Sequence, residues 1–360
     1  MRAAIVHDWF QGYHGAERTV EAIRSVLVGQ GSEPDIFTFH AARELLPPEL
    51  AAAIVGESRL AALRGVRQRG HDPGRWRYLL PVMAAYFRRL PLERYDVVVA
   101  TSHAFAVQAR PRRDATHLCY CFTPIRYAWL PQTDRRLPAL AGRLRRLDFD
   151  ASRRPDAYAA ISTAVRDRIR RFYGRDAVVI HPPVDVGDFD PGQPKDPEHF
   201  LWAHRLVPYK RPEVVVEAFR GLPYRLTMVG VGPLEASLRS ELPPNVRLVR
   251  WLPREELARL FAESAGFIHV GEEDFGITMV EALAAGTPVV ALRAGGARDI
   301  VREGVDGLFV DRAEPGAVRE ALRVVARANW DAQALAARAR EFSRERFVEQ
   351  FGGYLASLTR

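Results

Sequence analysis

Two carboxylates frame a short segment in the second half of the chain. Residues 272–283 read EEDFGITMVEAL, in which Glu273 and Glu281 are separated by seven residues. Apolar runs lie on both sides of this segment, and an acidic group in a buried setting needs a charged or hydrogen-bonding partner. The two glutamates are therefore candidates for binding a ligand rich in hydroxyl groups. The alternative is a capping carboxylate that is followed by an ordinary amphipathic helix.

The residues between the two carboxylates predict a helix that begins near Ile277, after a loop that ends with Phe275. The backbone N–H groups of Gly276, Ile277 and Thr278 would lie at the positive end of the helix dipole, a position that suits a phosphate. Glu281 lies one turn further along. It could accept hydrogen bonds from a ribose diol, as acidic groups do in dinucleotide sites.

A second group of candidates is cationic. Arg205 and Lys210 in RLVPYK (205–210) follow FLWAH, which predicts a strand, so both side chains would emerge at its carboxyl end. There they could grip a diphosphate and stabilise charge on a leaving group, or they are surface cations that pair with nearby acids. Gly230 in GVGP (230–233) follows another apolar run. This G-x-G lacks the third glycine of a dinucleotide fingerprint, so Gly230 either lines a nucleotide or forms a simple turn.

The first half of the chain offers a glycine loop and a histidine. Gly12 and Gly15 in HDWFQGYHGAER (7–18) precede a helix that is expected to begin at Ala16 and whose N-terminus could meet a phosphate or an acceptor. Their G-x-x-G spacing does not fit the G-x-G-x-x-G of NAD sites. His103 follows the apolar run DVVVAT and is either a hydrogen-bonding group for a sugar hydroxyl or a histidine in a surface turn.

These candidates are positioned by apolar runs that alternate with helical stretches. Such alternation predicts βαβ units and parallel sheets, and 360 residues are too many for one ordinary core. The expected fold class is α/β, with two doubly wound, Rossmann-like domains joined by the linker-like segment 184–199. Because ligands of such sheets bind at the carboxyl ends of the strands, the active site is expected in the cleft between two facing domains. Strands are expected at 3–8, 35–39, 96–101, 116–122, 157–162, 178–182, 200–204, 224–230, 246–251, 266–270, 287–292 and 307–310.

Composition and charge narrow the function classes. No apolar run is long enough to span a membrane, and the strand-like start MRAAIVHD lacks the features of a secretory signal. Cys119 and Cys121 lie in an apolar strand and would point to opposite faces, which favours reduced core residues over a metal site and predicts a cytoplasmic location. Residues 1–190 carry 29 basic and 21 acidic side chains, whereas 191–360 carry 23 of each. The basic half could attract a phosphate-rich surface.

Two basic segments of the first half also contain apolar and aromatic residues. Residues 64–90 alternate arginines with aromatic and aliphatic side chains, and residues 135–149 are similar. This pattern is typical of an element that contacts an anionic membrane or an acceptor, or of a helix whose arginine face is merely solvated. No recognised nucleic-acid motif accompanies the arginines, so nucleic acid is not an expected partner.

Over essentially its whole length, the chain resembles the family 4 retaining glycosyltransferases, which have the GT-B fold. The second half carries the most specific motifs: RLVPYK (205–210), the E-x7-E of EEDFGITMVE (272–281) and ALAAGTPVVALRAGGARDIV (282–301). The first half is similar to the bacterial polysaccharide mannosyltransferase branch through IVHDWFQGYHGAER (5–18) and CYCFTPIRYAW (119–129), and PPVD (182–185) matches the usual crossover. The resemblance implies an acceptor-side domain (1–183), a domain that binds the nucleotide sugar (184–342), and a last helix (343–360) that crosses back to the first domain.

The resemblance also assigns roles to the candidates. Glu273 would contact the hydroxyls of the donor sugar and Glu281 would bind the ribose, while Arg205 and Lys210 would hold the diphosphate. The expected catalytic residues are thus Glu273, Arg205, Lys210 and His103, the last facing the donor sugar. The expected donor-binding residues are Glu281, Gly276, Ile277, Thr278, Phe275, Gly230, Gly12 and Gly15.

Three positions depart from the family pattern. His14 stands where similar proteins often have the first of two glycines, Phe122 stands where they often have a histidine, and Arg250-Trp251 replaces a more usual Gly-Trp.

The mechanism that the resemblance implies is transfer with retention, in which the diphosphate leaves from the face that the incoming hydroxyl attacks. Such chemistry depends on stabilising the departing phosphate rather than on a strong base. No clustered Asp/Asp motif is evident, so neither a metal nor another cofactor is expected. The expected donor is GDP-mannose and the expected acceptor is a cell-surface polysaccharide or lipid-linked glycan at the inner face of the membrane. The alternatives are a transferase that uses UDP-glucose or another donor on a small soluble acceptor, and a catalytically silent protein that binds a nucleotide sugar.

Overall fold

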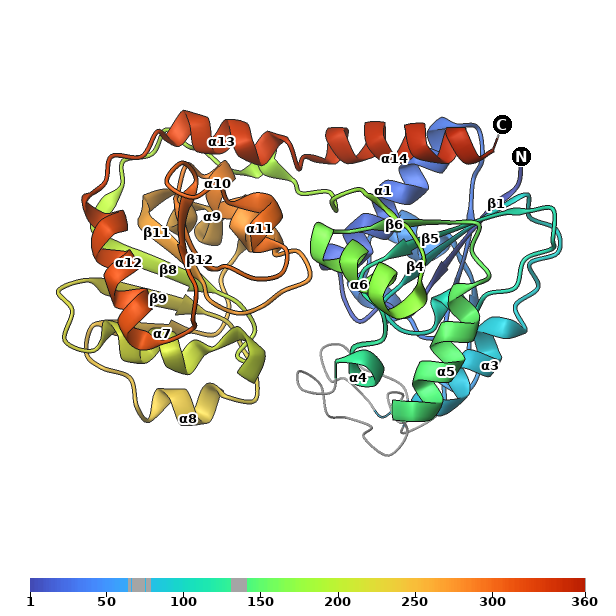
Figure 1. Ribbon diagram of the computed structural model, residues 1–360, viewed down its shortest axis with the longest axis horizontal. Coiled ribbons are helices and arrows are strands. Elements are labelled where there is room, and N and C mark those ends of the chain that lie inside the picture. The colour runs from blue at the N-terminus through green and yellow to red at the C-terminus, as the bar shows by residue number, and fades with distance from the viewer. Residues whose placement is uncertain (64–65, 67–74, 76–78, 131–140, 360) are drawn as a thin grey trace. The chain divides into compact units, whose positions relative to one another are not determined.

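The computed structural model describes residues 1–360 except 64–65, 67–74, 76–78, 131–140 and 360. The chain forms two compact units, one made of Met1–Pro183 with Phe347–Arg360 and the other of Val184–Arg346. Each unit is a parallel β-sheet flanked by helices (Figure 1). The fold class expected from the alternating strands and helices is therefore confirmed.

The N-terminal unit has a seven-stranded sheet in the order β3-β2-β1-β4-β5-β6-β7. The strand order reverses between β1 and β4, and loops at such a switch point commonly hold ligands. The strands are β1 (Ala3–His7), β2 (Asp35–Thr38), β3 (Ile54–Glu57), β4 (Val97–Ser102), β5 (Thr116–Cys121), β6 (Ala157–Ala160) and β7 (Val178–Val179). The helices are α1 (Gly15–Gly29), α2 (Pro48–Ala52), α3 (Leu80–Arg88), α4 (Arg126–Trp129), α5 (Ala141–Ser152) and α6 (Thr163–Tyr173).

The C-terminal unit has a six-stranded sheet in the order β10-β9-β8-β11-β12-β13, and its strand order reverses between β8 and β11. The strands are β8 (Asp196–Ala203), β9 (Arg225–Val229), β10 (Val246–Val249), β11 (Ser264–His269), β12 (Val289–Leu292) and β13 (Gly307–Val310). The helices are α7 (Pro212–Phe219), α8 (Glu235–Arg239), α9 (Arg254–Glu263), α10 (Ile277–Ala284), α11 (Ala297–Ile300), α12 (Pro315–Arg327) and α13 (Ala332–Arg340).

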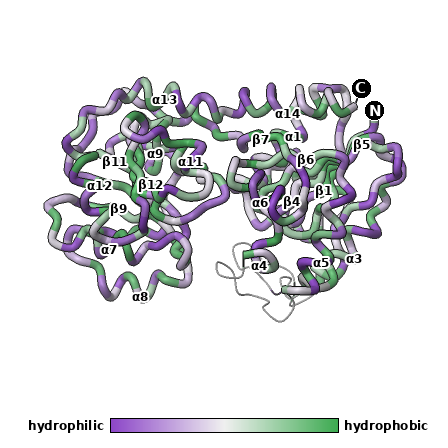
Figure 2. The backbone as a smooth tube through the Cα atoms, viewed as in Figure 1, coloured by the Kyte–Doolittle hydropathy of each residue, from purple (hydrophilic) through white to green (hydrophobic). Residues whose placement is uncertain are grey.

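Each unit has its own apolar core, and the central strands are hydrophobic along most of their length (Figure 2). Such continuous runs are expected for parallel strands that are covered on both faces. Cys119 and Cys121 are free thiols buried in β5. Among the described residues, no helix is both long enough and apolar enough to span a membrane.

Two strand predictions were wrong. β3 was missed because Ile54–Glu57 is a four-residue edge strand that contains a glycine. β8 begins at Asp196, inside the segment expected to be a linker, because its polar start pairs with neighbouring strands: His199 is in register with Arg225, and Arg225 also forms an ion pair with Asp196.

The last helix, α14 (Arg344–Leu358), is divided between the two units at Phe347. Its buried residues Phe347, Phe351 and Leu355 recur every four positions and so form one apolar stripe. The rings of Phe347 and Phe351 lie 5.8 and 5.9 Å from that of Tyr120 in β5. The helix also lies beside α1 (Figure 1), where Gln30 Nε2 donates to the carbonyl of Gly352 at 3.2 Å.

Candidate active site

The loops that follow β8 and β9 are in direct contact at the carboxyl edge of the C-terminal sheet. Leu206 N donates to the carbonyl of Val231 at 2.9 Å. A Cβ at Gly230 would lie 1.9 Å from the carbonyl oxygen of His204, so only glycine permits this approach. The structure thus places Gly230 against the segment that carries Arg205 and Lys210.

Lys210 and Glu273 form an ion pair across the switch point of this sheet. Lys210 ends a short 3-10 helix after β8, and its side chain is 8% exposed; Glu273 follows β11 and is 19% exposed. A pair this dry is stabilised only if each charge compensates the desolvation of the other. Two of the expected catalytic residues are therefore brought together by the adjacency of β8 and β11.

A pair of buried histidines lies beneath this ion pair. His269 Nε2 is 3.8 Å from Glu273 Oε2, and the ring centroids of His204 and His269 are 4.7 Å apart. Burial, followed by the nearby charge of Lys210, holds the pKa of both imidazoles well below the usual range. Both rings are therefore neutral at physiological pH. Sequence reasoning missed them because each occupies the end of an apolar strand.

Arg205 is the most exposed of the expected catalytic residues of this unit. Its Nη2 donates to the hydroxyl of Tyr209 at 3.1 Å. Within the described part of the chain it forms no ion pair with Glu273 or Glu281. Its guanidinium therefore remains accessible to an anion.

Helix α10 begins next to Glu273, as expected. Gly276 is its N-cap with φ of 107°, and Ile277 is its first residue. The hydroxyl of Thr278 is buried without a hydrogen-bond partner among the described residues. Phe275 is 4% exposed and its ring packs 5.8 Å from that of Phe342, so its side chain belongs to the core.

The loop that contains Glu273 packs against Gly295 and Gly296, which follow β12. Gly296 N donates to the carbonyl of Glu273 at 2.9 Å. Gly295 has φ of +59°, and a Cβ there would lie 2.0 Å from the same carbonyl oxygen. The pair is visible in the sequence as RAGGARD, but its contact with Glu273 depends on the fold.

Glu281 is buried within α10 and is held by Arg254, the first residue of α9. Arg254 Nη1 donates to Glu281 Oε1 at 2.9 Å, while Arg254 Nε donates to Asp188 Oδ2 at 3.0 Å. The Arg254 guanidinium also lies over the ring of Phe189, with its carbon 5.2 Å from the centroid. Neither Arg254 nor Asp188 was expected at the site.

Lys195, the other lysine of the chain, fixes the far ends of α9 and α10. Its ammonium donates to the carbonyls of Ala262 and Ala285, at 2.6 and 2.8 Å, and to the hydroxyl of Thr287 at 2.6 Å. The last carbonyls of a helix lack internal partners and attract a cation. Lys195 therefore ties the C-termini of both helices together.

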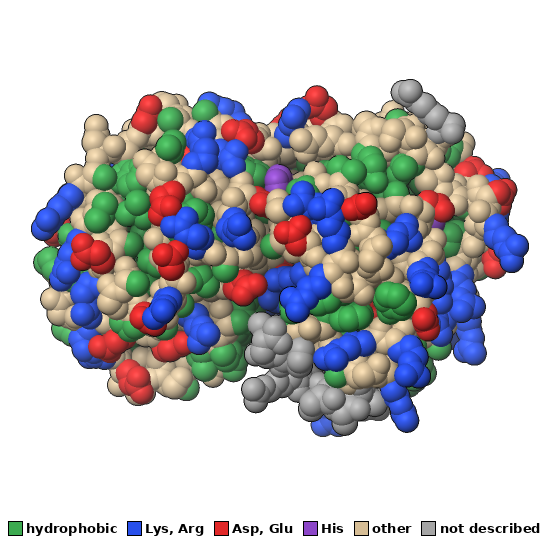
Figure 3. Space-filling model, in the orientation of Figure 1, with side chains coloured by type: hydrophobic (Ala, Val, Ile, Leu, Met, Phe, Trp, Pro, Cys, Tyr) green, Lys and Arg blue, Asp and Glu red, His purple; other side chains and the backbone are tan. Residues whose placement is uncertain are grey.

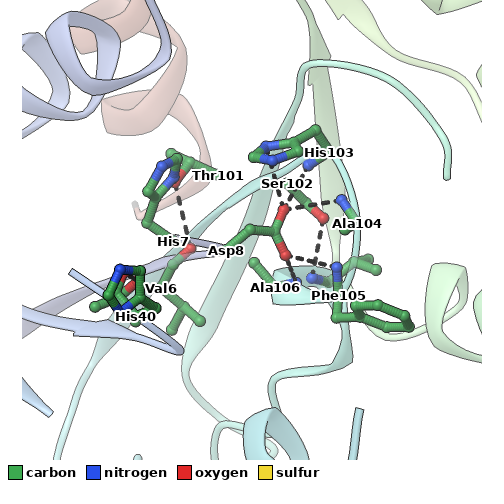
Figure 4. Close-up of polar contacts among 12 residues, drawn as sticks. Val6, His7, Asp8, His40, Thr101, Ser102, His103, Ala104, Phe105 and Ala106 are labelled. Carbon is green, nitrogen blue, oxygen red and sulfur yellow. Dashed lines mark hydrogen bonds and ion pairs between the residues drawn. The ribbon is translucent and has the colours of Figure 1, made fainter. Parts of the chain in front are cut away.

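In the N-terminal unit, Asp8 organises the loop that contains His103. Its fully buried carboxylate accepts hydrogen bonds from four consecutive backbone N–H groups, those of residues 103–106, at 2.5–2.8 Å (Figure 4). The same carboxylate lies 3.4 Å from His103 Nδ1. Asp8 follows β1 and the loop follows β4, so this cluster occupies the switch point of its sheet. Asp8 was missed because its partners are backbone groups.

Aromatic rings surround His103. The Trp9 ring lies 4.5 Å from that of His103, and Phe122 lies 6.1 Å away. His7 is 6.0 Å from His103 and shares a 2.8 Å hydrogen bond with the hydroxyl of Thr101. Burial lowers the pKa of His7 to about 3. Phe122 thus adds an apolar wall where similar proteins often have a histidine.

The glycine loop is shaped by its neighbours. Gly15 is the first residue of α1, one position earlier than expected, and Gly12 lies against the ring of His14, where a Cβ would be 2.9 Å from Nε2. Glu17 Oε2 accepts from His14 N at 3.0 Å, and burial raises the pKa of Glu17. The start of α1 therefore already has a carboxylate of the chain beside it.

The basic aromatic segments are only partly described. Of the arginines proposed to meet a membrane, Arg67, Arg69 and Arg77 lie outside the described residues, as does much of segment 64–90. Over the visible face of the molecule, basic side chains are interspersed with acidic ones (Figure 3). Within the described part of the chain, no group of three or more His, Cys, Asp or Glu side chains could hold a metal ion.

Two family models match the chain, one in each half. The model described as Glycosyltransferase Family 4 matches residues 13–188, and the model described as Glycosyl transferases group 1 matches residues 186–344. Among curated proteins, a D-inositol 3-phosphate glycosyltransferase of Nocardioides sp. is 37% identical over 203 residues, 46% of this chain and 44% of that protein. One from Mycobacterium tuberculosis is 34% identical over 168 residues, 40% of this chain and 35% of that protein. The chain thus spans less than half the length of these relatives.

Solved structures share the fold at low sequence identity. Anabaena HepE in complex with UDP has a TM-score of 0.71 and 16% identity, covering 99% of this chain and 100% of that one. Sucrose-phosphate synthase from Thermosynechococcus elongatus has a TM-score of 0.73 and 17% identity, covering 99% of both chains. These likenesses show the GT-B fold.

Proposed function

We propose that this protein transfers a sugar from a nucleotide sugar to a hydroxyl group, with retention of the anomeric configuration. The proposal is consistent with the two family models that match the chain, Glycosyltransferase Family 4 followed by Glycosyl transferases group 1. The observation that carries this proposal is the largely buried Lys210–Glu273 pair beside the start of α10. It combines a cation, a carboxylate and the first N–H groups of a helix, which have no partner within the helix, and these groups suit a diphosphate and a sugar.

The roles of the residues follow from their charges and places. Lys210, Arg205 and the backbone at 276–278 hold the diphosphate and stabilise the charge that develops on it as the sugar departs. Glu273 accepts hydrogen bonds from hydroxyls of the donor sugar, and Glu281 from those of the ribose. His103, with one ring nitrogen facing Asp8, presents the other to the sugar. Because two side-chain cations serve the phosphates, the reaction is proposed to need no metal.

The donor and acceptor are proposed from resemblance. GDP-mannose is the proposed donor, on the likeness of CYCFTPIRYAW (119–129) to bacterial polysaccharide mannosyltransferases. The proposed acceptor is a growing polysaccharide or lipid-linked glycan at the inner face of the membrane, which residues 64–90 would contact. Curated relatives named for D-inositol 3-phosphate favour a second candidate, transfer to a small phosphorylated polyol.

A binding panel tests the donor. Thermal unfolding with GDP, UDP and ADP, and with GDP-mannose and UDP-glucose, should raise the melting temperature with the preferred base because only the native state binds it. Glu273→Gln should abolish transfer while the exposed Glu255→Gln, the control, keeps it. A chain that no nucleotide stabilises would contradict the proposal. Binding without turnover on any acceptor would instead indicate the catalytically silent alternative.

Acceptor and membrane are tested separately. Transfer is measured to lipid extracts and to inositol 3-phosphate, with EDTA added to each; loss of activity that Mg²⁺ or Mn²⁺ restores would refute metal independence. Neutralising Arg67, Arg69, Arg75 and Arg77 together should reduce binding to anionic vesicles. Unchanged partitioning would remove the membrane contact from the proposal.

A further inference from the structure

Arg254 stands where a helix disfavours a cation. It is the first residue of α9, next to the positive end of the helix dipole. Its guanidinium nevertheless bridges two carboxylates, Glu281 and Asp188, and stacks on Phe189. Partners from two other segments therefore fix this one side chain.

Glu281 depends on that guanidinium for its placement. The glutamate side chain is 7% exposed, and within the described part of the chain only Oε1 has a side-chain partner, Arg254 Nη1. A carboxylate that is buried to this extent needs a charged or hydrogen-bonding partner. Fixing Oε1 also fixes the plane of the carboxylate, and so the direction in which Oε2 accepts.

We infer that Arg254 is a positioning residue, which holds Glu281 through Oε1 so that Oε2 accepts hydrogen bonds from the ribose hydroxyls of the nucleotide. Asp188 in turn holds Arg254. This inference rests on the proposed function, since it assumes that Glu281 meets a ribose. The physical basis is preorganisation. The fold already orders the Glu281 carboxylate, so the entropy cost of ordering this side chain does not reduce the affinity for the nucleotide.

The geometry also opposes the view that Arg254 merely fills the ribose position. Asp188 and the Phe189 ring hold the guanidinium through a hydrogen bond and a cation–π contact, neither of which involves Glu281. An arginine that blocked the site would have to leave both partners when nucleotide binds.

The test compares nucleotides that differ only in ribose hydroxyls. Isothermal titration of the full chain with GDP, 2′-deoxy-GDP and 3′-deoxy-GDP, and with the UDP series in parallel, gives the dependence of affinity on each hydroxyl. The variants are Arg254→Met, Arg254→Lys, Asp188→Asn and Glu281→Gln. Arg259→Met is the matched control, because it removes an exposed arginine from the same helix.

The wild-type chain should bind the parent nucleotide about tenfold or more tightly than its weaker deoxy analogue, as expected for a hydrogen bond to a charged group. Arg254→Met should reduce this ratio to within about twofold, as Glu281→Gln does, with a matching loss of affinity for the parent nucleotide. Arg254→Lys and Asp188→Asn should give intermediate ratios, and Arg259→Met the wild-type ratio. A residue that only stabilised the fold would lower all affinities together and leave the ratio unchanged.

Two results overturn the inference alone. In one, Glu281→Gln loses the hydroxyl dependence but folded Arg254→Met keeps it. In the other, Arg254→Met binds GDP or UDP more tightly than wild type, which would make Arg254 a competitor of the ribose. If circular dichroism shows Arg254→Met to be unfolded, Arg254→Lys and Asp188→Asn decide, and wild-type ratios in both refute the inference. A wild-type chain that binds neither GDP nor UDP refutes the proposed function as well.

Discussion

The Lys210–Glu273 pair predicts that two single substitutions are each more damaging to stability than their combination. Removing one partner of a buried ion pair leaves the other charge uncompensated, at a cost of about 3–5 kcal/mol. The Lys210 side chain is 8% exposed and that of Glu273 is 19% exposed. Glu273→Gln isolates the drier charge and should cost the full amount. Lys210→Met isolates a carboxylate that retains some water, so it should cost about 2–3 kcal/mol.

The double variant Lys210→Met/Glu273→Gln removes both charges. Replacing a buried pair by uncharged side chains of similar volume is often neutral, so its stability should lie within about 1 kcal/mol of wild type. The two substitutions are therefore strongly non-additive, with a coupling energy of about 4–8 kcal/mol. Under the proposed function, transfer activity should fall about 100-fold or more in all three variants, because each lacks a charge that is proposed to act on the reacting groups.

Urea unfolding followed by tryptophan fluorescence measures these stabilities, and Trp202 reports from the core of the same unit. With a slope of about 2 kcal/mol per molar urea, a loss of 3 kcal/mol lowers the midpoint by about 1.5 M. Glu255→Gln should leave the midpoint unchanged. If the double variant loses the sum of the two single losses, the side chains do not interact. If it regains stability and also keeps activity, the pair has no part in the reaction.

Three further substitutions probe the stability of the fold and of the loops that carry the candidate site. Burial lowers the pKa of His117 from 6.5 to about 4. Between these pH values the unfolded chain binds one more proton than the folded chain, so the free energy of unfolding falls as the pH drops from 6.5 toward 4. His117→Leu should therefore remove about 1.4 kcal/mol per pH unit from this slope, as measured by urea titrations near pH 5. Gly295→Ala would place a methyl group 2.0 Å from the carbonyl oxygen of Glu273, so kcat should fall about tenfold or more, whereas Gly304→Ala, at a similar positive φ in open space, should not change it. Asp8→Asn replaces acceptor lone pairs by an NH2 group that faces backbone donors, so thermal unfolding should show that the free energy of unfolding is lower by about 2–4 kcal/mol. An unchanged melting temperature would mean that the loop after β4 keeps its conformation without these hydrogen bonds.

Much of the fold could be predicted because the strands are apolar and regular. The central strands of both sheets are parallel and buried on both faces, and such strands are nearly continuous apolar runs bounded by glycine, proline and acidic residues. The E-x7-E spacing was informative for the same reason. It places one glutamate in the loop after a strand and the other one turn inside the next helix, and the structure has Glu273 and Glu281 in these places.

The partners of these residues could not be predicted, because they depend on which strands are neighbours. Lys210 meets Glu273 because β8 lies next to β11, an order that no local pattern in the sequence specifies. Arg254 is one of many arginines, and Asp188 lies in a polar segment that is indistinguishable from a linker. His269 was hidden in an apolar strand, where a buried neutral imidazole leaves the hydrophobic pattern unbroken.

In both units, a carboxylate in one loop at the switch point compensates polar or charged groups of the adjacent loop. These groups need partners because the two loops leave the sheet side by side at its carboxyl edge. In the N-terminal unit the carboxylate of Asp8, after β1, satisfies the backbone of the loop after β4. In the C-terminal unit the carboxylate of Glu273, after β11, compensates Lys210 after β8. The difference is that Asp8 is fully buried and its carboxylate is satisfied by backbone N–H groups, whereas Glu273 retains exposed surface and its partner, Lys210, could also pair with a phosphate. That difference is the physical reason to assign Asp8 to positioning and Glu273 to the ligand.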